Sequence, residues 1–467
     1  MPLKTTHRRS PQKLTSVGIE SIRASKMITM QKSRGDNMCL PHGNELTRRS
    51  LMQGLAAVLG LGVLTRRARG ADGGQQASAA EAAGAEPYSS AILPPTIRSR
   101  FVNNGNGLRM HVLEAGFETR PRPAVVLLHG FPELAYSWRK VMPRLASAGF
   151  HVIAPDLRGY GRTSGWDVKY DDDLSPFRTL NEVRDILGLV SAFGYGSVAA
   201  VVGHDFGSPL AAWCSVVRPD VFRSVVLMSA PFAGPPSLPF DTADAPPSVR
   251  TANAPHDRIY DDLAALIPPR KHYQRYYATR EANDNMWHAA QGVHAFLRAY
   301  FHMKSADWQN NKPYALKSWT AAELAKLPHY YVMELSKGMA ETVAPEMPSP
   351  AAIAACKWLS EDELNVYSAE SSRTGFQGGL QGYRVGMDSQ NTAELRTFSG
   401  RTIDVPSLFI AGKSDWGVYQ RPGAFEAMQK SVCTQMRGAH LIESAGHWVQ
   451  QEQPEQVSRL LIQFLKQ

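Results

Sequence analysis

Asp205 is the residue whose type and position most clearly indicate chemistry. It is the central residue of a Gly-His-Asp-Phe-Gly run (203–207), between a β-rich run at 197–202 and a helix-compatible stretch at 209–217. This is the layout of a nucleophile elbow, a tight strand-to-helix turn that lifts its central side chain above a sheet and needs glycine on both sides. A carboxylate is ionised at neutral pH and attacks carbon without a general base. The run therefore predicts a nucleophile that forms an alkyl ester, with an ordinary turn aspartate as the alternative.

Two further residues, Asp415 and His447, complete a predicted triad. An ester intermediate must be hydrolysed, which requires a histidine to activate water and an acid to orient that histidine. Asp415 follows the strand-like run 406–411, and His447 follows the strand-like run 440–443. Taken singly, each has a plain structural explanation, a turn or cap for Asp415 and a loop for His447. The order nucleophile, acid, histidine along one chain favours catalysis.

Backbone groups near Asp205 predict an oxyanion hole. The apolar run 125–128 has the pattern of a buried strand and leads into a His-Gly-Phe-Pro-Glu loop. We expect one N–H from Phe131 in this loop and a second from Phe206, the residue after the nucleophile. His129 and His204 are expected to have structural roles, because the partners of His129 would be backbone groups and the side chain of His204 should point away from Asp205.

These motifs, taken together, resemble the Asp-nucleophile epoxide hydrolases of the α/β-hydrolase fold. The resemblance extends from about residue 100 to the C-terminus. It implies a hydrolase that opens epoxides with water to vicinal diols, without a metal or an organic cofactor. The matching segments are 129–133 (His-Gly-Phe-Pro-Glu), 137–139 (Ser-Trp-Arg), 156–162 (Asp-Leu-Arg-Gly-Tyr-Gly-Arg), 203–205 (Gly-His-Asp) and 446–450 (Gly-His-Trp-Val-Gln).

The same resemblance implies two lid tyrosines that donate hydrogen bonds to the epoxide oxygen. The first is Tyr273, within Lys-His-Tyr-Gln (271–274), and the second is Tyr383, within Gly-Tyr-Arg (382–384). An epoxide oxygen becomes an anion when the ring opens, so a donor must meet it. The alternative for either tyrosine is a packed residue of the hydrophobic core.

The chain departs from the family pattern at two positions. Phe206 stands where this family usually has Trp, and Ser208 replaces a glycine. The related haloalkane dehalogenases use that Trp to bind the departing halide, and Phe has no N–H to donate. A dehalogenase acting on haloalkanes or haloacids is therefore the weaker alternative, and a non-catalytic binding protein on the same fold is another.

The elements that must position these residues belong to an α/β fold, a mostly parallel sheet with helices on both faces. The segment between the strand-like run 224–229 and the run 406–411 is too long for a loop, and its Tyr- and Trp-rich stretches indicate helices. We therefore expect a hydrolase core formed by 95–232 and 401–467, a helical cap at 233–400 and a leader at 1–94. The active site should lie at the carboxyl ends of the strands, under the cap.

Composition excludes several other functions. Residues 1–94 hold 13 Lys and Arg against 6 Asp and Glu, so the leader carries most of the formal charge of +9 and no nucleic-acid partner is expected. The cysteines at 39, 214, 356 and 433 have no paired spacing and are expected to be free thiols. No His/Cys spacing indicates a metal site. A dinucleotide-binding site is not expected either, because Ser164 stands where the glycine fingerprint requires Gly. The sequence does not favour any particular oligomeric state.

The leader has the pattern of a twin-arginine export signal. Arg48 and Arg49 precede an apolar run at 51–64. Basic residues follow this run, and a low-complexity segment at 70–86 comes after them. This run is too short to span a membrane. The pattern favours export to the periplasm or the exterior. A disordered basic tail on a cytoplasmic protein and an organelle transit peptide are the alternatives.

Overall fold

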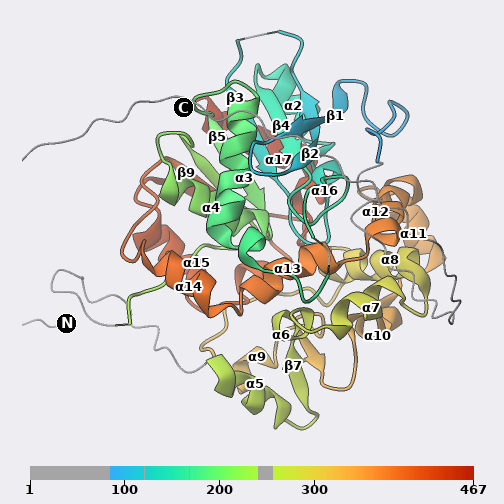
Figure 1. Cartoon of the computed structure of the whole chain (residues 1–467). Helices are drawn as coiled ribbons and strands as arrows, with labels where there is room; N and C mark the ends of the chain where they lie inside the picture. The colour runs from blue at the N-terminus through green and yellow to red at the C-terminus, as the bar shows by residue number, and fades with distance from the viewer. Residues whose placement is uncertain (1–84, 120, 168, 240–255) are drawn as a thin grey trace, which may run out of the picture. The chain divides into compact units, whose positions relative to one another are not determined.

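The computed structural model describes residues 85–119, 121–167, 169–239 and 256–467. Their centre is an eight-stranded sheet in the order β1-β2-β4-β3-β5-β6-β9-β10 (Figure 1). β1 and β2 pair antiparallel, as do β2 and β4, and all other pairs are parallel. The predicted, mostly parallel sheet is thus confirmed. Its strands are β1 (Ile97–Asn103), β2 (Arg109–Ala115), β3 (Ala124–Leu128), β4 (His151–Pro155), β5 (Ala200–His204), β6 (Val225–Met228), β9 (Ser407–Gly412) and β10 (Met436–Ile442).

Alternate residues of the central strands face two separate hydrophobic clusters. In β3, Val125 and Leu127 belong to one cluster, and Val126 and Leu128 belong to the other. The first cluster includes residues of α2 (Met142–Ser147) and α17 (Pro454–Leu465), and the second includes residues of α3 (Thr179–Ala192) and α4 (Gly207–Val217). Helices therefore cover both faces of the sheet, and strands buried on both faces are apolar throughout.

The segment between β6 and β9 is mostly helical, and in Figure 1 its helices lie below the sheet. It also contains a short antiparallel pair, β7 (Arg270–His272) with β8 (Val332–Glu334), that we did not predict. Strands of three residues are too short to show an alternating pattern. The helices are α5 (His256–Ala264), α6 (Tyr273–Tyr277), α7 (Glu281–Trp287), α8 (Gly292–Lys304), α9 (Ala321–Leu324), α10 (Met339–Val343), α11 (Pro350–Ala355), α12 (Glu361–Thr374), α13 (Gln377–Val385) and α14 (Ser389–Arg396).

Two residues that precede the expected start of the core at residue 95 pack into the first hydrophobic cluster. Tyr88 and Leu93 are buried in the first cluster, and the Tyr88 ring packs edge-on against His111 at a centroid distance of 5.1 Å. Two isolated apolar residues give no periodic pattern, so sequence could not assign them to the core. The twin-arginine pair, the apolar run and Cys39 lie outside the described residues.

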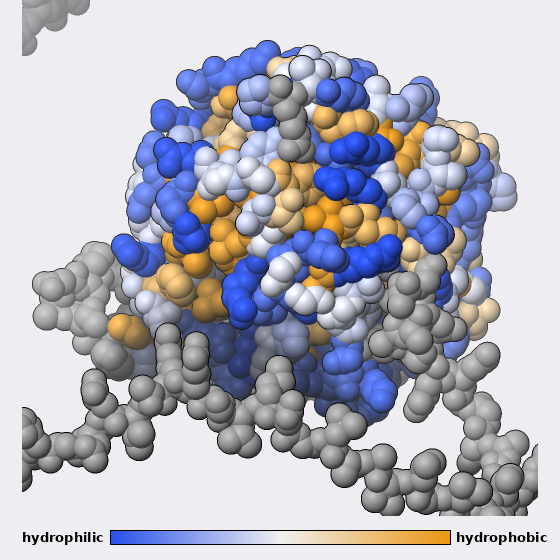
Figure 2. Space-filling model, turned by 45° about the horizontal axis from the view of Figure 1, so that its top comes forward, coloured by the Kyte–Doolittle hydropathy of each residue, from blue (hydrophilic) through white to orange (hydrophobic). Residues whose placement is uncertain are grey.

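The described residues also include three of the four cysteines. Cys214, Cys356 and Cys433 are free thiols. Among the described helices, none has the length and apolar character that crossing a bilayer requires. The face in Figure 2 shows apolar side chains gathered between hydrophilic ones, as is common on folded proteins, whose surfaces are partly apolar.

Candidate active site

Asp205 lies at a sharp turn between β5 and α4. Its φ of 51° is in the left-handed region that residues other than glycine rarely adopt. A Cβ on Gly203 would lie 1.8 Å from the Gly207 carbonyl oxygen, and a Cβ on Gly207 would lie 2.3 Å from the Leu128 carbonyl oxygen. Both flanking residues must therefore be glycine, and the tight packing holds Asp205 in a strained conformation.

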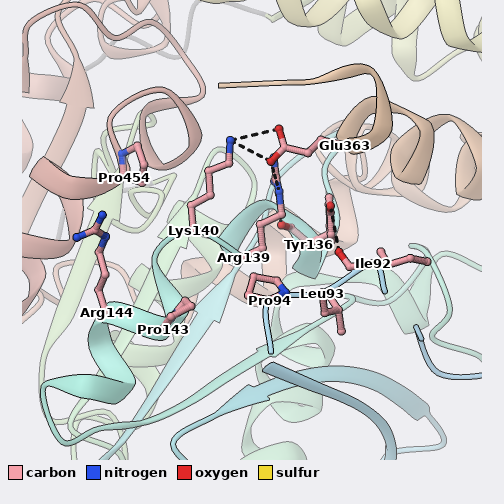
Figure 3. A pocket seen from close by; sticks show the side chains of 10 residues that line it. All are labelled: Ile92, Leu93, Pro94, Tyr136, Arg139, Lys140, Pro143, Arg144, Glu363 and Pro454. Atoms are coloured by element: carbon pink, nitrogen blue, oxygen red, sulfur yellow. Dashed lines mark hydrogen bonds and ion pairs between the residues drawn. The ribbon is translucent and has the colours of Figure 1, made fainter. Parts of the chain in front are cut away.

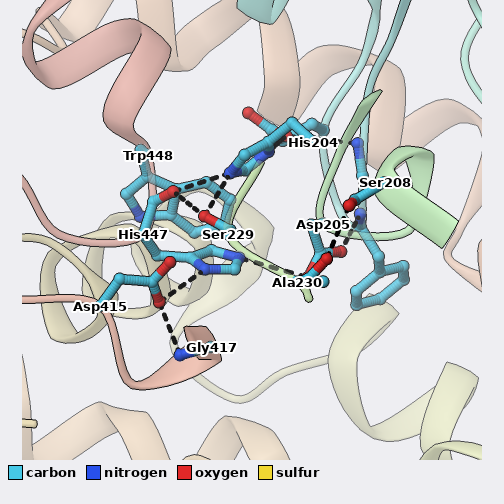
Figure 4. A network of polar contacts seen from close by, with 12 residues as sticks. His204, Asp205, Ser208, Ser229, Ala230, Asp415, Gly417, His447 and Trp448 are labelled. Carbon is cyan, nitrogen blue, oxygen red and sulfur yellow. Dashed lines mark hydrogen bonds and ion pairs between the residues drawn. The ribbon is translucent and has the colours of Figure 1, made fainter. Parts of the chain in front are cut away.

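The structure brings Asp205, His447 and Asp415 together, although they are far apart in the chain. His447 Nε2 lies 3.3 Å from Asp205 Oδ2, and His447 Nδ1 lies 3.1 Å from Asp415 Oδ1. Figure 4 shows the imidazole between the two carboxylates. Asp415 follows β9, and its Oδ1 also accepts the Gly417 N–H at 2.7 Å, which fixes the carboxylate. The arrangement is that of a nucleophile, a base and an acid that orients the base.

The electrostatics of the site favour ionised carboxylates. Burial alone would raise the pKa of Asp205, but the contact with His447 and then the charge of Lys304 bring it well below its ordinary value. Burial would also raise the pKa of Asp415, but attraction to His447 and the hydrogen bonds to its carboxylate together lower it. Asp205 is thus a carboxylate at neutral pH and available as a nucleophile.

Backbone donors also lie beside Asp205. The Phe131 N–H donates to Asp205 Oδ1 at 3.0 Å. The Phe206 N–H makes no hydrogen bond within the described residues, so it is free to meet an acceptor. Gly130 permits this approach, since a Cβ there would lie 2.3 Å from the Asp205 Cβ.

The two predicted lid tyrosines lie close to each other and to the oxyanion residues. The rings of Tyr273, at the start of α6, and Tyr383, in α13, are 5.9 Å apart. The Tyr383 ring packs edge-on against Phe206 at 4.6 Å and against Phe131 at 5.5 Å. The Tyr273 hydroxyl donates to Gln420 Oε1 at 3.2 Å, a partner from the loop after β9.

Both tyrosine hydroxyls remain protonated at neutral pH. Burial is the main reason that the pKa of each lies well above its ordinary value, and the negative charge of Asp205 raises each further. A protonated phenol is a hydrogen-bond donor. Tyr273 and Tyr383 can therefore donate to an oxygen that gains negative charge near Asp205.

A buried ion pair lies behind the elbow, and no role was predicted from the sequence for one of its two members, Glu133. His204 Nδ1 lies 2.6 Å from Glu133 Oε2, and His204 Nε2 lies 2.7 Å from the His447 carbonyl oxygen. Both partners are acceptors, so both ring nitrogens carry protons and His204 is an imidazolium. Its link to the His447 backbone supports the predicted structural role. Glu133 was quoted only as a motif residue, because its pairing depends on tertiary contacts.

Two other residues singled out from the sequence contact only the backbone with their polar side-chain atoms. His129 Nδ1 donates to the Gly130 carbonyl oxygen at 2.9 Å, and its Nε2 accepts the Leu157 N–H at 3.0 Å, as predicted. The Ser208 hydroxyl donates to the Ala230 carbonyl oxygen at 2.6 Å. The serine that replaces a glycine is thus accommodated in the elbow without an unsatisfied hydroxyl.

A surface cavity of about 620 Å³ lies apart from these residues (Figure 3). Its cations are already paired: Arg139 and Lys140 with Glu363 at 2.9 and 3.0 Å, and Arg144 with Glu455 at 2.6 Å. Elsewhere in the described part of the chain, no group of three His, Cys, Asp or Glu side chains is placed to hold a metal. The triad region is therefore the candidate site.

Comparison with known proteins agrees with this geometry. Residues 123–253 match the family model described as alpha/beta hydrolase fold. Epoxide hydrolase B of Mycobacterium tuberculosis is 32% identical over 369 residues, which cover 78% of this chain and 96% of that protein. The chain belongs to the epoxide hydrolase family. Epoxide hydrolase A of the same organism is 33% identical, over 77% of this chain and 95% of that protein.

A solved structure from the same family shows the same fold. An epoxide hydrolase from an endophytic Streptomyces superposes with a TM-score of 0.62 at 31% identity, over 80% of this chain and 96% of that chain. The α/β-hydrolase fold expected from the sequence motifs is thus confirmed for this epoxide hydrolase family member.

Proposed function

We propose that this protein hydrolyses epoxides to vicinal diols through a covalent ester on Asp205. The observation that carries the proposal is the contact chain from Asp205 through His447 to Asp415, with distances of 3.3 and 3.1 Å. Family membership supports the substrate class, since relatives that match nearly their whole length are named epoxide hydrolases.

The first step is attack by Asp205 on a ring carbon of the epoxide. A bond forms between a carboxylate oxygen and this carbon, the ring C–O bond breaks, and its electron pair stays on the epoxide oxygen. Tyr273 and Tyr383 donate hydrogen bonds to that oxygen and stabilise its charge, and the oxygen then takes up a proton from solvent to become the first hydroxyl of the diol. The lowered pKa of Asp205 and the raised pKa of both phenols support these roles.

The second step is hydrolysis of the ester. His447 takes a proton from water, and the resulting hydroxide attacks the carbonyl carbon of the Asp205 ester. The tetrahedral anion is held by the N–H groups of Phe131 and Phe206. The ester C–O bond then breaks, the diol oxygen takes the proton held by His447, and the Asp205 carboxyl loses its own proton to solvent, while Asp415 orients His447 and stabilises its charged form.

Trapping the ester tests this mechanism. His447→Gln should form the ester once and fail to release it, giving an adduct on Asp205 that mass spectrometry can locate. Asp205→Ala should form none. In ¹⁸O-labelled water, the diol from a single turnover of the wild-type enzyme should carry oxygen from the carboxylate. Solvent oxygen in that first diol would mean that water attacks the epoxide directly, which excludes the ester.

We propose in addition that residues 233–400 act as a lid over the site. Support comes from Tyr273 and Tyr383, which belong to this segment and whose rings lie within 5.9 Å of each other beside Asp205. Insertion of a helical segment between β6 and β9 leaves the core sheet intact. The lid excludes water from the first step, which strengthens hydrogen bonds to the developing anion.

We also propose that the leader directs export through the twin-arginine route. The support is the sequence pattern of Arg48, Arg49 and the apolar run 51–64. Changing both arginines to lysine should retain the protein in the cytoplasm of a bacterial host. Unchanged fractionation would favour a basic tail on a cytoplasmic enzyme.

A further inference from the structure

Lys304, the last residue of α8, is a buried cation without a direct ionic partner. Its side chain is only 3% exposed. Among the residues that the structure describes, none accepts a hydrogen bond from its ammonium group or forms an ion pair with it. Its Nζ lies over the rings of Trp448, Tyr300 and Tyr331, at 5.2, 5.3 and 5.5 Å from their centroids. Lysine is rarely buried unless it is paired, so this charge requires an explanation.

The position of Lys304 relates it to the proposed catalytic residues. Its carbonyl oxygen accepts the His447 N–H at 2.8 Å. The Trp448 ring contacts the His447 ring at 4.7 Å, and the Tyr331 ring contacts the Tyr273 ring at 5.0 Å. Two of the rings beside the ammonium group, those of Trp448 and Tyr331, therefore contact the proposed base and one of the proposed lid phenols.

The counterpart of this charge is Asp205. After burial and the contact with His447, the charge of Lys304 is the next influence on the pKa of Asp205, and it lowers that pKa. The aromatic rings around Lys304 exclude water, and a low dielectric increases the range of the attraction. The aromatic faces also stabilise the cation themselves.

The proposed reaction places one negative charge near this position in each of its two bond-forming steps. It begins on the Asp205 carboxylate, moves to the epoxide oxygen when the ring C–O bond breaks, and returns as the tetrahedral anion during ester hydrolysis. We propose that Lys304 is the fixed counter-charge of the active site, acting through Asp205 and the anions that replace its charge. The inference rests on the proposed function.

Replacement of the charge tests this role in ester formation. Lys304→Met gives an unbranched side chain one atom shorter and without the charge, and Lys304→Arg keeps the charge. Lys312→Met, at an exposed lysine of the same segment, is the matched control. In rapid-quench single turnovers with styrene oxide, Lys304→Met should slow formation of the Asp205 ester on the order of tenfold or more. Lys304→Arg should recover most of this rate, and the control should match the wild type.

The pH profile separates an electrostatic role from a packing role. Loss of a cation raises the pKa of Asp205, so the acid limb of ester formation should move to higher pH in Lys304→Met. Lys304→Gln, which keeps a polar group in the aromatic cage, should show the same movement if Lys304→Met does not fold. An unchanged rate and an unmoved acid limb would overturn the proposal.

Two further outcomes are distinguishable. A loss confined to epoxides that carry a carboxylate, with neutral epoxides unaffected, would make Lys304 a substrate-binding residue and overturn its role as counter-charge. A wild-type enzyme that yields diol with no Asp205 adduct would refute the ester mechanism itself. Adduct formation by Lys304→Met at the wild-type rate would refute only the inference about Lys304.

Discussion

Replacing Glu133 by Gln should destabilise the protein through the buried pair with His204. The Glu133 carboxylate faces donors on three sides: His204 Nδ1 at 2.6 Å, and the side-chain amides of Gln450 and Gln451 at 2.8 and 3.1 Å. A glutamine of the same size has one acceptor oxygen and would turn its own N–H₂ toward at least one of these donors.

The size of the effect follows from the burial of both partners. Neither side chain of the pair is exposed, so removing one charge leaves the other without compensation. Such losses cost about 3–5 kcal/mol in the free energy of unfolding. Glu443→Gln is the matched control, because it breaks an exposed pair with Lys413 and should barely change the free energy of unfolding.

The difference between the wild type and Glu133→Gln should depend on pH in a defined direction. Burial would raise the pKa of Glu133 and lower that of His204, but their mutual attraction, together with their hydrogen bonds and other nearby charges, lowers the pKa of Glu133 and raises that of His204. The contribution of Glu133 is lost as pH falls through its lowered pKa, and that of His204 is lost as pH rises through its raised pKa. The difference should therefore be largest between about pH 4.5 and 6.5.

Urea unfolding followed by circular dichroism across this pH range measures the effect. A loss below about 1 kcal/mol, similar to that of the exposed control, would show that the pair is not ionised or is readily replaced. A loss that grows steadily above pH 7 would contradict the assigned charge of His204, since its stabilising contribution can only decrease there.

Three other outcomes are expected. Tyr273→Phe and Tyr383→Phe should each slow ester formation by about tenfold to a hundredfold in single turnovers, with the double variant slower than either; full activity in the double variant would exclude these tyrosines. The wild-type enzyme should open epoxides but release no halide from 1-haloalkanes, because Phe206 has no donor for a departing halide; halide release at rates comparable to diol formation would favour the dehalogenase alternative. Glu452→Gln should slow ester hydrolysis but not ester formation, because Glu452 accepts backbone N–H groups on both sides of His447 at 2.9 and 3.0 Å; equal rates of hydrolysis in both proteins would contradict this.

Much of the site could be predicted because its signals are local in sequence. The glycines around Asp205 reflect a turn in which a Cβ has no room, and the places of Asp415 and His447 after strand-like runs bring them to one edge of a parallel sheet. The two proposed lid tyrosines were predicted only from short matching segments around them.

The remainder depends on contacts that no local pattern records. Glu133 and Lys304 differ from surface charges only in what surrounds them after folding, and nothing near residue 304 in the sequence indicates three aromatic faces. The hydrogen bond from Tyr273 to Gln420 joins segments 147 residues apart. Burial, pairing and the three-residue strands β7 and β8 therefore required the structure.

The backbone hydrogen bond from His447 to the end of α8 limits how lids can be exchanged between relatives. A chimera that replaces the whole segment between β6 and β9 would also replace the carbonyl group of residue 304, which holds the histidine loop. If the exchanged segment begins after Ser305, residue 304 and the core come from the same parent protein, and Tyr383 is still exchanged. Such grafts should keep the geometry of the histidine while altering which epoxides fit, which makes the later part of the lid the better region for changing specificity by recombination.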